Sequence, residues 1–212
     1  MKRNRCKKIA AALLCMVMGC TTLGQGFSAA AADATTSEEE VGINFAKALQ
    51  MSLYFYDANK CGSGITGGNL EWRGDCHTED AAVPLKPMGE DYKGTNLSQE
   101  FIDAHRDILD PDGDGTIDVS GGMHDAGDHV KFCLPGSYAA STLGWGYYEF
   151  RDAYVDSGQQ WHIEDILHWF NDYYLKCTYF DENGDILAFC YQVGEGNIDH
   201  NYWNAPELQN ES

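Results

Sequence analysis

The sequence predicts one mostly α-helical domain whose functional residues lie in long loops. Of its 212 residues, 43% are apolar and 12% aromatic, which is enough to build the core of one domain of ordinary size. Apolar residues recur at helical spacing in several segments, and the longest stretch between them is rich in glycine and proline. This composition excludes a disordered chain.

Residues 1–32 have the layout of a secretory signal peptide. A basic start precedes an apolar run from Ile9 to about Gly24, and alanine-rich sites of the A-x-A kind follow near Ala30. The run is shorter than the roughly 20 residues that a spanning helix needs, and no later segment is apolar enough to span a bilayer. We therefore expect a secreted, extracellular protein without a membrane span. Lipid attachment at Cys20 is the less favoured alternative.

The net charge narrows the choice of partners. Of the 14 lysines and arginines, five lie in the expected signal peptide, so 9 basic residues remain against 33 acidic ones, a net charge of −24. Such a surface repels phosphate backbones, and we expect no nucleic-acid partner. A neutral polymer or a cation is compatible with this charge.

The domain is expected over residues 41–212, after a solvated linker at 33–40. Its first helix is predicted over 41–58, where four apolar residues share one face: Phe45, Leu49, Leu53 and Tyr56. Residues 60–95 contain too much glycine and proline for regular structure and predict a long loop. A loop of that length inside a compact domain usually has a function or a clamp.

Three more helices are predicted further along the chain. Ser98 can cap a short helix that runs to Leu109. Pro135 stands at a suitable start for a helix over 136–154, because proline is tolerated in a first turn. Another helix is expected over 163–176, and the Asn-Gly pair that follows predicts a tight turn into a short extended segment. Because helices alternate with long loops that carry polar and charged side chains, we expect the functional residues to lie in the loops.

The stretch SGGMHDAGDHVKF, residues 120–132, concentrates groups that can do chemistry. Asp125 and Asp128 lie three apart on a glycine-flanked turn, with His124 and His129 beside them. Two carboxylates on such a turn can point at one water or one cation, and their proximity raises the pKa of one of them. A general base with a helper carboxylate, a calcium site and a helix-capping pair all fit the spacing.

Combined motifs identify a family. The segments HDAGDHVKFCLP, GSYAASTLGWGYYEF and QVGEGNIDHNYWNAPEL, within about residues 44–208, resemble the N-terminal half of a glycoside hydrolase family 9 cellulase. This resemblance implies an (α/α)6 toroid of six helical hairpins with long active-site loops, of which the chain would form about the first half. It also implies an endo-β-1,4-glucanase-like enzyme that cleaves cellulose or β-glucan with inversion.

The resemblance also assigns site residues. Asp128 corresponds to the general base that activates water, and Asp125 to the residue that helps to hold that water. His200, Tyr202 and Trp203 match positions that line the glucan cleft. A flat aromatic ring covers the apolar C–H face of a sugar, and an imidazole bonds its hydroxyls.

The proton donor is the part of the family pattern that this sequence does not match. An inverting hydrolase needs its acid roughly 6.5–9.5 Å from its base, so the Asp125–Asp128 pair cannot fill both roles. Glu195, Glu207 and Glu211 do not match the donor motif. We therefore expect a fragment that needs the missing C-terminal half of the catalytic domain and is inactive alone. The alternative is a non-catalytic carbohydrate- or calcium-binding module.

A zinc site and a disulfide compete for the same cysteines. Five cysteines remain after the signal peptide, an odd number for an exported chain. Cys61, Cys76, His77 and His124 supply two thiols and two imidazoles, the donor set of a closed structural zinc site. Some members of the family carry a similar site. A Cys61–Cys76 disulfide and free thiols remain open alternatives, and no organic cofactor is expected.

The segment DPDGDGTID, residues 110–118, resembles the start of an EF-hand loop. The candidate calcium ligands are Asp110, Asp112, Asp114 and Asp118. Position twelve of the loop is Gly121 instead of the acidic residue that closes such a loop, so we expect a weak site or one completed from elsewhere. A solvated acidic turn explains the pattern equally well.

Overall fold

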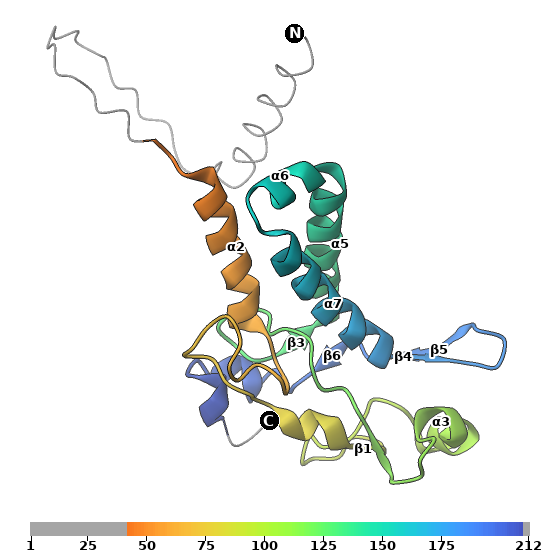
Figure 1. Ribbon diagram of the computed structural model, residues 1–212. Coiled ribbons are helices and arrows are strands. Elements are labelled where there is room, and N and C mark those ends of the chain that lie inside the picture. The colour runs from red at the N-terminus through yellow and green to blue at the C-terminus, as the bar shows by residue number, and fades with distance from the viewer. Residues whose placement is uncertain (1–41, 210–212) are drawn as a thin grey trace, which may run out of the picture. The chain divides into compact units, whose positions relative to one another are not determined.

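The computed structural model describes residues 42–209, and from Ile43 onward these belong to one compact unit (Figure 1). The expected signal peptide, the linker, Cys20 and Glu211 lie outside the described residues. The helices are α2 (Phe45–Asn59), η1 (Thr78–Ala82), α3 (Gln99–Ala104), α4 (Arg106–Leu109), α5 (Cys133–Glu149), α6 (Arg151–Asp156), α7 (Gln160–Lys176), η2 (Asp199–Asn201) and η3 (Pro206–Leu208). The strands are β1 (Val83–Pro84), β2 (Thr116–Ile117), β3 (Lys131–Phe132), β4 (Thr178–Phe180), β5 (Ile186–Phe189) and β6 (Gln192–Val193).

The longer helices form close to where the apolar spacing predicts them, and side-chain caps mark the starts of α2 and α3. The Asn44 side chain accepts a hydrogen bond from the Lys47 backbone N–H at 2.9 Å at the start of α2. Ser98 caps α3 through the Phe101 N–H at 3.2 Å, as predicted. Two expected helices are each divided in the structure, because the chain leaves helical geometry at His105 and again at Phe150.

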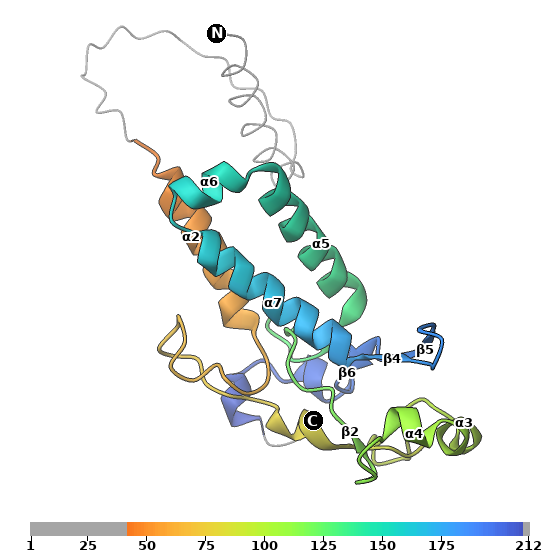
Figure 2. The same cartoon turned by 45° about the vertical axis from the view of Figure 1, so that its right-hand side comes forward.

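Helix α7 packs against α2, α5 and α6, which together form what we call the helical layer (Figure 2). The buried side chains between these helices are Leu53, Tyr154, Ile163, Ile166 and Phe170. No helix in the range 42–209 combines the length and the apolar character needed to cross a membrane.

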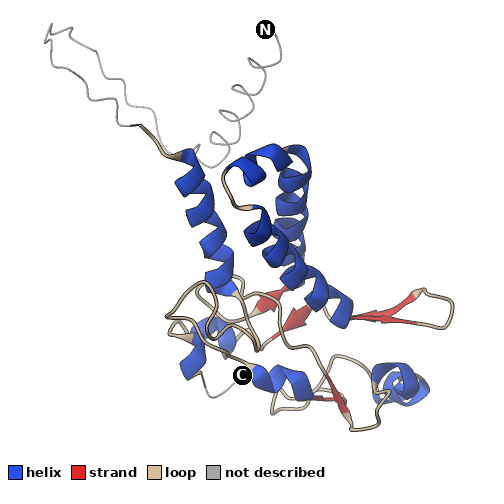
Figure 3. Cartoon of the chain, viewed as in Figure 1, coloured by secondary structure: helices blue, strands red, loops and turns tan. Residues whose placement is uncertain are grey.

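The segments 60–132 and 190–209 form the loop layer, which lies at one end of the helical layer (Figure 3). The mostly helical prediction is confirmed, and the short extended segment predicted after the Asn-Gly turn is strand β5. The described residues form three two-stranded antiparallel sheets, β1–β2, β3–β6 and β4–β5, of which the first two were not predicted. Their strands have two to four residues, too few for an alternating pattern to be visible in the sequence. The β3–β6 pair matters most for the site, because it joins the end of the 120–132 segment to Gln192 and Val193.

Candidate functional site

The Asp125–Asp128 turn is held from three directions by backbone hydrogen bonds. The His124 N–H donates to the Asn59 carbonyl at 2.8 Å, which ties the turn to the end of α2. The Asp125 N–H donates to the Val130 carbonyl at 2.9 Å and closes the turn. The His129 N–H donates to the Asp199 carbonyl at 3.2 Å, which brings η2 alongside. The turn is therefore a fixed platform for its two carboxylates.

Asp128 points inward and is bonded to a residue 72 positions away. Its side chain is 2% exposed, and Nδ1 of His200 donates to its Oδ2 at 2.9 Å. The His200 side chain is 58% exposed, so it joins the buried carboxylate to solvent. The predicted base and a predicted substrate contact are thus in direct contact.

Trp203 covers the middle of the same turn. A Cβ atom at Gly127 would stand 2.8 Å from the Trp203 ring, so only glycine leaves room for the indole. The Trp203 Nε1–H donates to the His200 carbonyl at 2.6 Å, and the ring is still 60% exposed. Its position presents an aromatic face to solvent beside Asp125 and Asp128.

Asp125 is exposed, and its electrostatic environment differs from that of Asp128. Partial burial raises the pKa of Asp125, and the Asp128 charge raises it further, while the His200 charge acts in the opposite direction. The two carboxylates therefore interact, as their spacing predicts.

Tyr202 is half-buried, and its ring lies against the histidines of the loop layer. Its ring contacts His129, with centroids 5.3 Å apart, and His129 in turn contacts the rings of His77 and His124. Tyr202 therefore joins the turn to the histidine cluster, whereas His200 and Trp203 are the more exposed members of the predicted cleft.

The sequence reasoning missed a set of buried residues that support the turn. Lys131 is 2% exposed and donates to Asp80 at 2.7 Å and to two backbone carbonyls. The Gln209 side chain donates to Asp199 at 2.7 Å and contacts the ring nitrogens of His77 and His129. These contacts join residues far apart in the chain, and Asp80 and Gln209 lie outside every motif that the sequence offered.

Cys61, Cys76, His77 and His124 are all buried, and their ligand atoms lie within 4.8 Å of one another. The pKa of the Cys76 thiol is lowered, mainly by a hydrogen bond with Cys61 and then by the two imidazoles. Both cysteines are free thiols in the structure. The predicted donor set is thus brought together from three separate segments.

The orientation of the two histidines fits a metal. Nε2 of His77 contacts the Gln209 side-chain oxygen at 3.1 Å, so His77 directs Nδ1 at Nε2 of His124, 3.4 Å away. Metal-binding histidines commonly use one ring nitrogen for the metal and the other for such a partner. His77 also has a φ of 46°, a strained value for a residue with a side chain. The surroundings therefore hold this imidazole in place.

Only three of the four candidate calcium ligands in the 110–118 loop lie close to one another. Ligand oxygens of Asp110, Asp112 and Asp114 lie within 4.8 Å of one another. Asp110 is 5% exposed, and its Oδ1 has no hydrogen-bond partner among the described residues. Asp118 is directed elsewhere, since it accepts from Ser120 and pairs with Lys176 at 3.1 Å.

Comparison with known proteins identifies relatives of this chain. A profile described as Glycosyl hydrolase family 9 matches residues 45–212. Endoglucanase A of Bacillus pumilus is 32% identical over 176 residues, which are 83% of this chain and 21% of that protein. The chain spans about a fifth of that relative.

Two solved structures extend the comparison. The catalytic domain of Clostridium thermocellum CelT is 57% identical with a TM-score of 0.73, over 79% of this chain and 33% of that one. Endoglucanase CelQ from Clostridium thermocellum, complexed with cellotetraose, is 31% identical with a TM-score of 0.54, over 79% of this chain and 21% of that one. With the family profile matched across nearly all of the described residues, the chain belongs to glycosyl hydrolase family 9.

Proposed function

We propose that this chain forms the water-activating side of the catalytic centre of a β-1,4-glucan hydrolase. The observation that carries the proposal is the convergence of Asp128, His200 and Trp203 on one fixed turn. The names of the relatives as endoglucanases, and the cellotetraose bound by CelQ, support cellulose or a related β-glucan as the substrate.

In this proposal Asp128 is the general base. It takes a proton from the water that attacks the anomeric carbon, and Asp125 holds that water from the exposed side of the turn. His200 fixes the buried carboxylate through its 2.9 Å hydrogen bond. The exposed face of Trp203 packs against the C–H face of a glucose ring. Inversion requires a general acid on the opposite face of the sugar, roughly 6.5–9.5 Å from the base.

Glu195 and Glu207, the two glutamates of the described residues that were considered as the general acid, are both hydrogen-bonded to other groups. Glu207 pairs with Arg73 at 2.7 Å and accepts from the Gly74 N–H. Glu195 accepts from the backbone N–H groups of Asn197 and Ile198. This chain covers 33% of the CelT chain, and we propose that the acid lies in the counterpart of the remaining part.

A chimera tests the proposed function. Residues 45–208 of this chain would replace the matching third of the CelT catalytic domain, and hydrolysis of a soluble β-glucan would be measured. We expect Asp128→Asn to lower kcat by about 10²–10⁴-fold, the usual contribution of a general base. Asp172→Asn, an exposed change on α7, is the matched control. Proton NMR should show the α-anomer as the first product.

Each result of this experiment has a clear meaning. Asp128→Asn with more than a tenth of the activity would remove Asp128 as the base, and a β-anomer would contradict inversion. A chimera that binds cellotetraose without cleaving it would favour the alternative of a non-catalytic carbohydrate-binding module.

We propose that the four buried thiol and imidazole groups hold a structural zinc ion. When bound, zinc would fix the loop after α2 to the catalytic turn. Elemental analysis should find about one zinc per chain, lost in Cys76→Ser and kept in Cys190→Ser. No zinc, together with a peptide map in which Cys61 and Cys76 are cross-linked, would support the Cys61–Cys76 disulfide instead.

We also propose a calcium site in the 110–114 loop. The buried Asp110 Oδ1 without a partner is the observation that distinguishes this loop from a solvated acidic turn. Calorimetry should detect calcium binding that Asp110→Asn abolishes and Asp118→Asn leaves nearly unchanged. Equal loss in both variants would contradict the placement of Asp118 outside the cluster.

We propose, finally, that the protein is secreted after removal of residues 1–32. Mass spectrometry of the exported protein would find a new N-terminus near Asp33. A retained, lipid-modified Cys20 would support the lipoprotein alternative.

A further inference from the structure

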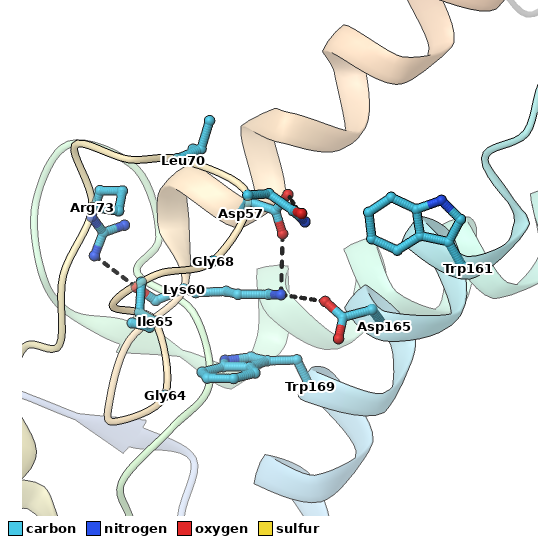
Figure 4. Close-up of a pocket in the computed structure, with 11 residues that line it drawn as sticks. Asp57, Lys60, Gly64, Ile65, Gly68, Leu70, Arg73, Trp161, Asp165 and Trp169 are labelled. Atoms are coloured by element: carbon cyan, nitrogen blue, oxygen red, sulfur yellow. Dashed lines mark hydrogen bonds and ion pairs between the residues drawn. The ribbon is translucent and has the colours of Figure 1, made fainter.

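A pocket of about 190 Å³ lies between the loop that follows α2 and one face of α7 (Figure 4). Its lining shares no residue with the turn at Asp125–Asp128 or with His200, Tyr202 and Trp203. Sites for drug-sized ligands usually measure about 300–1,000 Å³, so this pocket fits a ligand of about one ring.

Two tryptophans of α7 form part of the wall. Trp161 and Trp169 are eight residues apart, with Asp165 midway, so all three lie on one side of the helix. Trp161 is 55% exposed, and one face of its ring stacks on His162 with the planes 15° apart. Its exposure leaves the other face open to a ligand. A ring that is open on one face suits the flat C–H face of a pyranose.

The charged groups of the lining are already paired. Lys60 bonds Asp165 at 2.5 Å and Asp57 at 3.1 Å, and its ammonium lies 4.9 Å from the centre of the Trp169 ring. Arg73 is bound to Glu207 and to the Lys60 carbonyl. A charged ligand would have to compete with these ion pairs, so the pocket favours a neutral one.

Acceptors for hydroxyl groups remain at the rim. The Asp165 side chain is 49% exposed and bonds Lys60 through Oδ2. Its Oδ1 has no hydrogen-bond partner among the described residues, so it can accept a hydrogen bond from solvent or from a ligand. Asn69 donates to Asp57 through Nδ2 at 3.0 Å, which leaves its side-chain oxygen as a second acceptor. An aromatic face, paired charges and fixed acceptors together match a neutral sugar ring.

We propose that this pocket binds one glucose unit of a β-glucan chain, at a place separate from the catalytic turn. The choice of glucose among neutral sugars rests on the proposed function. A second contact of this kind would hold the polymer on the protein while the turn acts on another part of it, because linking two contacts raises the local concentration of the chain.

NMR of the full chain with ¹⁵N-labelled tryptophan tests this proposal. The sequence has five tryptophans, so their five indole N–H signals report separate places, and cellotetraose is the probe. As cellotetraose is added, we expect the Trp161 and Trp169 signals to shift together and to saturate with one dissociation constant. The same shifts should be seen in Trp203→Ala. In Trp161→Ala the curve reported by Trp169 should weaken by at least about tenfold. Trp72→Ala, an exposed tryptophan outside the pocket, should leave it unchanged.

The remaining outcomes separate this inference from the proposed function. A shift confined to Trp203 would overturn the pocket inference and leave the proposed glucan site standing. Pocket shifts that vanish in Trp203→Ala would also overturn it, since both signals would then report one site. No shift at any indole would overturn it as well, and the Asp128→Asn assay would decide the function independently. Inorganic phosphate binding as tightly as cellotetraose would contradict the preference for a neutral ligand.

Discussion

The helical layer and the loop layer are stabilised in different ways. Between the helices the buried side chains are mostly apolar, and they include Leu53, Ile163 and Phe170. The loop layer has an apolar cluster of its own, which includes Ile102 and Val119. Many charged and polar groups are buried there as well, and nearly every candidate site residue lies among or beside them. The buried polar residues of that layer are Lys60, Arg73, His77, Asp80, Asp110, His124, Asp128, His129, Lys131 and Asp199.

This difference has a physical reason. The backbone of a long loop forms few regular helix or sheet hydrogen bonds, so its backbone and polar groups must find other partners within the protein. A buried polar network fixes side chains in one geometry only when every member has its partner. The loop layer therefore offers fixed positions for catalysis, and it is sensitive to the loss of any single link.

The largest effect is expected from breaking the most buried ion pair of the loop layer. Lys131→Met removes the ammonium that binds Asp80 and the carbonyls of Val119 and Gly121. Leaving that carboxylate buried without its partner should lower the free energy of unfolding by about 3–5 kcal/mol, measured by urea denaturation. Lys93→Met, at an exposed position, is the control. A loss below about 1 kcal/mol would contradict the polar account of this layer.

The matching test in the helical layer removes apolar volume. Ile166 is fully buried between α7 and its neighbours, so Ile166→Ala should cost about 2–4 kcal/mol of unfolding free energy. We expect a smaller cost than for Lys131→Met, because a helical layer with an open face can relax around the cavity. Leu175→Ala, on the exposed side of the same helix, should change little. If Ile166→Ala lowered the free energy of unfolding more than Lys131→Met does, the proposed contrast between the layers would be wrong.

A buried ion pair of the helical layer makes that layer sensitive to acid. Asp57 is buried and accepts from His162 at 2.6 Å. Burial alone would raise the pKa of Asp57, but hydrogen bonds from His162 and Asn69 and the Lys60 charge lower it below its ordinary value. A carboxyl with a lowered pKa adds stability above its unfolded pKa, near 3.9, and loses it as the pH falls through the folded value.

Asp57→Asn should therefore lower the free energy of unfolding by about 1–3 kcal/mol at pH 7. The difference from the unchanged protein should begin to shrink below about pH 4, where the unfolded chain becomes protonated first, and should go on shrinking as the pH falls toward the lowered pKa of the folded protein. Urea denaturation at pH 7 and at pH 3 measures both values. Asp156→Asn, an exposed change at the end of α6, serves as the control. A difference that stays constant between the two pH values would show that charge is not the cause.

The same contrast explains how much the sequence could predict. Helices α2 and α7 follow from apolar spacing, and the Asp125–Asp128 turn follows from a local motif, because both signals lie within a few residues. Arg73 and Glu207 are 134 positions apart, and no local pattern links them. The breaks at His105 and Phe150 could not be predicted either, since helical spacing continues across them. The polar network that positions the site was thus the part hidden from the sequence.

The smallest effect on stability is expected on the exposed apolar side of α5. Leu134, Tyr138, Trp145 and Tyr148 are each more than two thirds exposed there, and contiguous apolar surface of this kind promotes association. Tyr148→Ser should change the free energy of unfolding by less than about 0.5 kcal/mol, because the ring is already in solvent in the single chain. Sedimentation velocity should nevertheless show less self-association than in the unchanged protein. If Tyr148→Ser and the exposed control Tyr92→Ser reduced association equally, general apolar exposure would be the cause, and α5 would have no special part in it.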